Sequence, residues 1–220
     1  MISQLPLFPL RSVLFPGVKI NLHIFEDRYR QMIGRCINDR SPFGIVLIQQ
    51  GDEVLEGRSQ ADLPQIAPIG TAAMINSHVR LDDGRFLITA IGTRRFQIQT
   101  LEQQSPYLIA SVTELPEAQA GEVARPISEL RTVYQRYWQA VAAATGATPQ
   151  VEELPDDPYH LTYQLADRLQ VSLERKQRWL EHDVSTRIRE ITGDLRAELL
   201  LMPNVKRRGG DELSGMNSLN

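Results

Sequence analysis

Apolar and polar residues alternate with a period of two near the start of the chain, and the period then becomes helical. Between residues 18 and 23 every second side chain is apolar, as in a strand with one buried face. This strand follows Phe15-Pro16-Gly17, a turn signal because proline presets φ and glycine accepts a positive φ. From Phe25 the spacing predicts a helix whose apolar face comprises Phe25, Tyr29, Met32, Ile33, Cys36 and Ile37.

The remainder of the first half is rich in predicted strands. Phe43–Ile48 is a continuous apolar run, typical of a strand buried on both faces. Strands over 69–81 and 85–91 are joined by Asp83-Gly84, a tight-hairpin signal. Gly92 predicts a bulge or bend before a strand over 94–100, and a last strand follows over 106–115. The polar residues 49–68 between these strands predict an unusually long loop.

The second half is predicted to be helical. One helix should begin near Pro126 and stop at Gly146, and three later helices should have Asp157, Ser172 and Asp183 as N-caps. The polar stretch 116–125 is the candidate linker. We therefore expect a β domain over 1–118, a helical bundle over 119–202 and a disordered polar tail over 203–220.

Four segments in this order resemble the amino-terminal, substrate-binding domain of Lon proteases. They are the opening LPLFPLRSVLFPGVKINLHIFEDRYRQMI (5–33), the hairpin LDDGRFLITAIGTRRFQI (81–98), the strand PYLIASVTEL (106–115) and the helical segment SLERKQRWLEHDVSTRIREITGDL (172–195). Each motif alone is moderately specific, but their order over residues 5–202 is hard to obtain by chance.

The resemblance implies an α+β fold, with a PUA-like, mostly antiparallel β pseudo-barrel followed by a C-terminal helical bundle. It also implies a non-catalytic module that binds hydrophobic or unfolded polypeptide segments, as an adaptor or chaperone-like accessory to a protease or chaperone. The sequence contains no G-x-x-x-x-G-K-[ST] phosphate loop, and none of its lysines lies in a segment like the Ser–Lys peptidase of Lon. We therefore expect a stand-alone member that lacks the ATPase and peptidase modules and needs no ATP.

Composition weighs against catalysis and metal binding. The lone cysteine, Cys36, excludes an intramolecular disulfide and a multi-cysteine zinc site, and its place on an apolar helix face indicates an inert thiol. The histidines are scattered at spacings that fit no metal template: His23, His78, His160 and His182. We expect no enzyme activity, no cofactor and no metal. The chain has neither a signal peptide nor an apolar stretch of roughly 18 residues, so a cytoplasmic location without membrane contact is expected.

RNA binding is the alternative function, because PUA-like barrels in other families bind RNA. Its support is Arg85, the pair Arg94-Arg95 and the basic run 206–208. The net charge of −3 and the pI of about 5.8 make nucleic acid an unfavourable partner for the chain as a whole.

A polypeptide-binding surface needs exposed apolar side chains. The candidates are Phe15 and Pro16, in a turn where a core role is awkward, and Phe25 and Tyr29 on the adjoining helix. The alternative for Phe15 and Tyr29 is ordinary core packing. Trp138 and Trp179 lie on helical stripes and are expected in the bundle core or between bundle and barrel.

Overall fold

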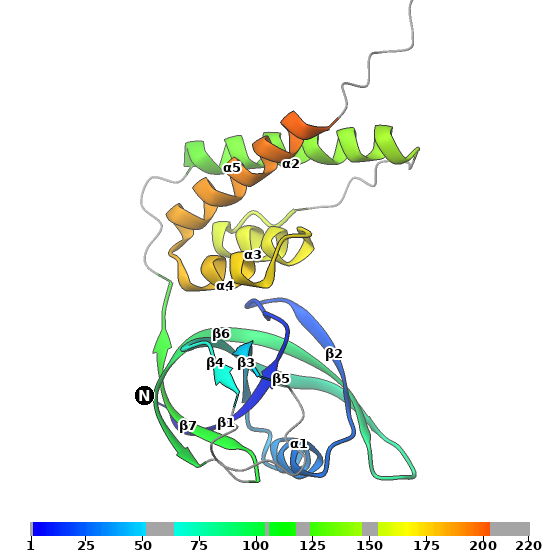
Figure 1. Ribbon diagram of the computed structural model, residues 1–220, viewed down its shortest axis with the longest axis vertical. Helices are drawn as coiled ribbons and strands as arrows, with labels where there is room; N and C mark the ends of the chain where they lie inside the picture. Colours follow the sequence, from blue (N-terminus) through cyan, green and yellow to red (C-terminus); the bar gives the residue numbers. More distant parts are fainter. Residues whose placement is uncertain (1, 52–63, 104–105, 118–123, 147–153, 203–220) are drawn as a thin grey trace, which may run out of the picture.

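Strands occupy the first half of the chain and helices the second, which confirms the predicted α+β class (Figure 1). The computed structural model describes residues 2–51, 64–103, 106–117, 124–146 and 154–202. Its strands are β1 (Ile2–Leu10), β2 (Lys19–Ile24), β3 (Phe43–Gln50), β4 (Gln65–Ile66), β5 (Ile69–Arg80), β6 (Phe86–Gln103) and β7 (Leu108–Leu115). Its helices are α1 (Asp27–Asp39), α2 (Ala124–Thr145), α3 (Pro158–Arg168), α4 (Leu173–Glu181) and α5 (Val184–Leu201).

Five strands close into a barrel in the order β1-β7-β6-β5-β3, and β3 returns to β1. The β1–β3 pairing is parallel and the other pairings are antiparallel. The predicted central strand is confirmed as β3, whose residues Phe43–Ile48 are all buried. Two short strands lie off this ring, since β4 pairs with β3 and β2 pairs with the first part of β6.

Strand β6 changes direction at a bulge. Gly92 pairs with Ala73 and Arg94 pairs with Ala72, so Thr93 is the extra residue. A Cβ at Gly92 would lie 2.3 Å from the carbonyl oxygen of Phe15, and only glycine permits this approach. The two strands predicted on either side of Gly92 are therefore one long bulged strand that pairs first with β2 and later with β7.

Helix α1 packs against the inner face of β2, β5 and β6. Tyr29, Met32, Ile33 and Cys36 are buried, as the helical spacing predicted. Burial raises the pKa of the Cys36 thiol, which disfavours the reactive thiolate. The prediction that Phe25 belongs to this face is wrong. Glu26 is the N-cap with an extended backbone, so Phe25 precedes the helix and continues the alternation of β2.

The four C-terminal helices form two layers above the barrel, with α3 and α4 next to it and α2 and α5 farther away (Figure 1). The predicted N-caps are confirmed, because the Asp157, Ser172 and Asp183 side chains accept hydrogen bonds from the first turns of α3, α4 and α5. Trp179 is buried as expected. Trp138 is 39% exposed, so its predicted core position is only partly correct.

Barrel and bundle share one hydrophobic cluster. Val13, Phe15, Leu47 and Ala67 from the β half pack with side chains from all four helices, including Tyr163 and Trp179. The expected boundary near residue 118 is thus crossed by buried apolar contacts. Residues 118–123, and most of the long loop and the tail predicted from the sequence, lie outside the described residues.

Two buried arginines reinforce this junction. Arg95 on β6 donates to the carbonyl oxygens of Leu180 (2.7 Å) and His182 (3.0 Å), at the C-terminal end of α4. Arg187 on α5 also donates to His182 O at 2.9 Å. Both guanidinium groups pair with Glu117, at 3.2 and 3.3 Å. The last turn of α4 is therefore held from the barrel and from the bundle, which favours one fixed orientation.

Candidate functional site

The structure does not bring the four predicted binding residues onto one surface. Phe15 is fully buried, and its ring centroid lies 5.8 Å from that of Tyr163 on α3. The expectation that Phe15 avoids the core is wrong, because α3 covers the turn that carries it. Tyr29 is also buried, with its ring 4.2 Å from that of Phe8. Pro16 and Phe25 remain accessible, at different places.

Phe25 belongs to an apolar surface that the sequence analysis missed. Val79 on β5 pairs with Leu87 on β6, and Leu87 pairs with His23 on β2, so all three side chains share one face of the sheet. This face is opposite to α1, since the alternate residues of β2 and β6 pack against that helix. The His23 and Phe25 ring centroids lie 5.9 Å apart. We call Phe25, Val79 and Leu87 the Phe25 patch.

The three side chains of the Phe25 patch are well exposed: Phe25 by 55%, Val79 by 59% and Leu87 by 45%. A sequence signal for Leu87 existed in the uninterrupted run Phe86-Leu87-Ile88. A strand that is apolar at consecutive positions presents apolar side chains on both faces. The run therefore predicts a strand with apolar side chains on both faces, of which only one face can pack against α1.

Charged groups fix the rim of the Phe25 patch. Arg85 Nε donates to Asp83 Oδ2 at 2.6 Å, and Arg85 Nη1 lies 3.3 Å from His23 Nε2. The backbone N–H of Arg85 also donates to Asp83, which is the main reason that the pKa of this carboxyl is lowered. Arg30 on α1 donates to the carbonyl oxygen of Asp83 at 3.0 Å. The tip of the β5–β6 hairpin is thus tied to α1.

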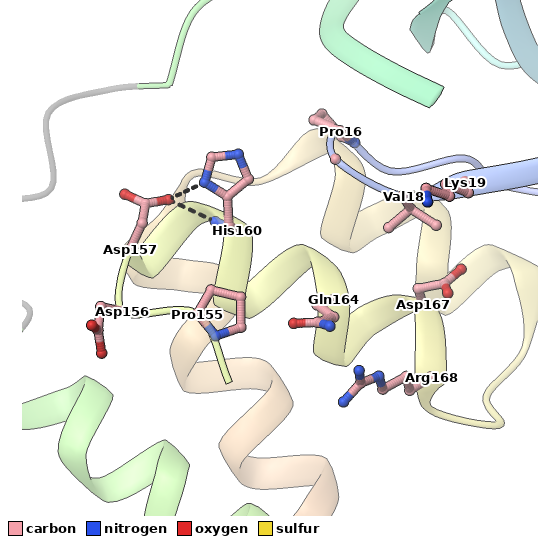
Figure 2. A pocket seen from close by; sticks show the side chains of 11 residues that line it. Pro16, Val18, Lys19, Pro155, Asp156, Asp157, His160, Gln164, Asp167 and Arg168 are labelled. Carbon is pink, nitrogen blue, oxygen red and sulfur yellow. Dashed lines mark hydrogen bonds and ion pairs between the residues drawn. The ribbon is translucent and has the colours of Figure 1, made fainter. Parts of the chain in front are cut away.

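A hollow of about 580 Å³ lies where the barrel meets the bundle (Figure 2). Residues Pro16–Lys19 form one wall, and one face of α3 with the residues before it forms the other. His160 Nδ1 lies 2.8 Å from Asp157 Oδ2 at its upper end. The Gln164 side-chain oxygen is buried without a hydrogen-bond partner among the described residues. Burial raises the pKa of Asp167 on the same wall, although Lys176 and Arg168 oppose this shift.

The arginines expected to favour RNA are already paired. Arg85 pairs with Asp83, Arg94 Nη1 lies 3.2 Å from Glu114 Oε2, and Arg95 is buried at the junction. The basic run 206–208 lies outside the described residues. Paired or buried cations attract phosphate weakly, so the described surface offers little support for RNA binding.

Within the described ranges, the structure places no three His, Cys, Asp or Glu side chains where they could hold a metal ion. No helix in the same ranges is both long and apolar enough to cross a membrane.

Comparison with known proteins places these features in a family. Residues 4–197 match the family described as the ATP-dependent protease La (LON) substrate-binding domain. Lon protease 2 of Myxococcus xanthus is 26% identical over 219 residues, which cover 98% of this chain and 25% of the relative. The Lon protease of Desulfosudis oleivorans is 25% identical over 204 residues, or 91% of this chain and 24% of the relative. The chain thus spans about a quarter of the length of these curated relatives.

Solved structures agree with this match. The crystal structure of a Lon N-terminal domain protein from Xanthomonas campestris superposes with a TM-score of 0.61 at 26% identity, over 92% of this chain and all of that one. The N-terminal domain of the Mycobacterium avium complex Lon protease superposes with a TM-score of 0.64 at 20% identity, over 88% of this chain and 98% of that one. The second likeness concerns the fold alone.

Proposed function

Because the chain belongs to the Lon substrate-binding domain family, we propose that it binds hydrophobic segments of unfolded polypeptides in the cytosol, without nucleotide and without catalysing a reaction. In this proposal the protein is an adaptor or chaperone-like accessory that delivers such segments to a protease. The family match supports a substrate-binding module, and the location of the binding surface is our own inference.

The observation that carries the proposal is the Phe25 patch. Three large apolar side chains, each at least 45% exposed, come from β5, from β6 and from the residue directly after β2. Scattered exposed apolar residues are normal on a protein surface, but here Val79 and Leu87 are cross-strand neighbours, and His23 lies between Leu87 and the Phe25 ring. The proposed surface therefore excludes the buried residues Phe15 and Tyr29. Of the four residues predicted from the sequence, it includes Phe25.

The polar rim suits a polypeptide better than a nucleic acid. Arg85 contacts both Asp83 and His23, so the rim carries charges of both signs. Binding through the Phe25 patch should therefore depend little on salt, whereas RNA binding weakens steeply with salt through counterion release. Because an unfolded ligand loses chain entropy on ordering, we expect a dissociation constant on the order of micromolar.

Leu87→Ser tests this site, and Leu101→Ser is its matched control. Both leucines lie on β6 and are similarly exposed, at 45% and 40%, but Leu101 lies in the part of β6 that pairs with β7. The probe is fluorescently labelled α-lactalbumin that has been reduced and carboxymethylated, so that it cannot fold. The Leu87→Ser variant loses one apolar contact, worth about 1 kcal/mol. Its dissociation constant for the probe, measured by fluorescence anisotropy, should therefore rise roughly fivefold.

The control variant should bind like the original protein. Equal affinities of all three proteins for the unfolded probe would show that the Phe25 patch is not the binding surface. Binding that disappears when the salt concentration is raised, or that a single-stranded RNA competes away, would favour the RNA alternative.

A further inference from the structure

We propose that a bound polypeptide adds a strand to the open edge of β2, so that the protein recognises the extended backbone of its ligand as well as apolar side chains. This inference rests on the proposed function and deepens it, because it names the conformation in which the ligand is held. Its physical basis is the pairing of β2, which has a partner strand on one side.

The hydrogen-bonding direction of β2 follows from its register with β6. The N–H of Gly92 donates to the carbonyl oxygen of Val18 at 2.9 Å, and Ile20 pairs with Ala90 in the same ladder. Because hydrogen-bonded pairs alternate in an antiparallel ladder, the N–H and C=O groups of residues 20, 22 and 24 point toward β6. Those of Lys19, Asn21 and His23 therefore point to the opposite edge, where no second strand pairs with β2 in the described part of the chain.

The side chains along this edge are arranged for an extended neighbour. Ile20 and Leu22 point toward the core beside α1, yet both are only partly buried, and no strand among the described residues covers them on the open side. Lys19, Asn21 and His23 alternate with them on the outer face and are exposed. A guest strand with alternating apolar residues would cover Ile20 and Leu22 with one set of side chains and leave the other set near the polar residues.

The open edge also joins the two accessible surfaces described above. Lys19, at the start of β2, lines the hollow beside α3, and His23, near its end, contacts the Phe25 ring. Six residues of strand span about 20 Å, so a single extended segment can reach from one surface to the other.

The occupant we infer is an extended polypeptide with alternating apolar residues. The N–H and C=O groups along a strand edge can form hydrogen bonds with the backbone of another strand. A helix cannot supply these bonds, because its backbone groups already bond to one another. A second copy of this chain is disfavoured. Pairing along a six-residue edge alone would bury less surface than the roughly 1,200–2,000 Å² that stable interfaces between proteins bury.

Backbone methylation of a peptide tests strand addition on the unmodified protein. The probe is a fluorescent twelve-residue peptide in which valine and threonine alternate, with a glutamate at each end. Two versions carry N-methyl groups, one on the valine nitrogens and one on the threonine nitrogens. In an added strand only one of these sets faces β2, so one version should bind at least tenfold more weakly and the other should bind nearly as well as the parent.

Equal binding of the two methylated versions, together with good binding of the parent peptide, would overturn strand addition and leave the proposed function intact. Absence of binding by the parent peptide and by unfolded α-lactalbumin would overturn both.

Asn21→Pro provides a second test on the protein side. Proline removes the N–H that points to the open edge but no bond to β6, so the strand should persist. Asn21→Ala is the control, because it removes the same side chain, including its contact with Thr89, and keeps the N–H. Asn21→Pro should weaken peptide binding at least fivefold relative to Asn21→Ala, with unchanged circular dichroism.

Amide hydrogen exchange should agree with this result. The peptide should slow exchange at residues 19, 21 and 23 more than at residues 20 and 22. Equal protection of both sets, or a concentration-dependent dimer that Asn21→Pro abolishes, would overturn the assignment of a polypeptide guest.

Discussion

Replacing Phe15 by alanine should strongly destabilise the protein, whereas the same change at Phe25 should not. The Phe15 ring is fully buried between the barrel and α3, in the cluster that both halves of the chain share. Emptying a buried phenylalanine site to alanine costs about 3–5 kcal/mol through lost transfer energy and the cavity left behind. The lost aromatic contact with Tyr163 contributes to that range.

Phe25 supplies a control of identical chemistry. Its side chain is 55% exposed, so Phe25→Ala should change the free energy of unfolding by less than about 0.5 kcal/mol. In a protein of this size each kcal/mol shifts the thermal midpoint by about 2–4 °C. Phe15→Ala should therefore lower the midpoint by roughly 6–20 °C, and Phe25→Ala by less than about 2 °C.

Differential scanning calorimetry measures both midpoints, and fluorescence anisotropy with carboxymethylated α-lactalbumin measures affinity well below them. We expect Phe15→Ala to be unstable and to bind normally while folded, and Phe25→Ala to be stable and to bind weakly. A loss of less than 1 kcal/mol for Phe15→Ala would refute its place in the shared core. Normal binding by Phe25→Ala would remove it from the binding surface.

Two further predictions concern the helices. Hydrogen bonds from the N–H groups of Thr186 and Ser185 lower the pKa of Asp183, so its cap stabilises the fold above the ordinary aspartate pKa and is lost as the pH falls through the lower folded value. Asp183→Ala should cost about 0.5–2 kcal/mol in urea unfolding at pH 7 and less at pH 3, whereas an equal cost at both would contradict this. Arg187→Met should cost about 3–5 kcal/mol because it leaves Glu117 without one of its two arginine partners. A double-mutant cycle with Glu117→Gln should show coupling, and strict additivity would refute it.

The local elements could be predicted because their causes are local. The buried strand Phe43–Ile48 is a continuous apolar run, and Asp157, Ser172 and Asp183 cap helices through bonds to residues two or three positions later. The order of four motifs also indicated the family and, with it, the α+β class. These signals lie within short windows of sequence, where periodicity and turn chemistry decide the backbone.

The proposed binding surface could not be predicted in the same way. Val79 and Leu87 are paired across a hairpin, and His23 and Phe25 reach the same face only because β2 pairs with β6 over 60 positions away. The sequence pattern shows which residues alternate, but it does not show which face of a strand another element will cover.

Phe15 and Phe25 show most plainly that tertiary packing decides which apolar side chains are buried. Both are phenylalanines beside a predicted turn or helix start, and local pattern treats them alike. Long-range packing separates them, because α3 folds over the turn at Phe15, while no described element covers the outer face of the sheet at Phe25. The sequence by itself therefore determined the elements and the family. The docking of distant elements decided which apolar side chains are core and which remain exposed, because burial depends on the neighbours that only the folded chain brings together.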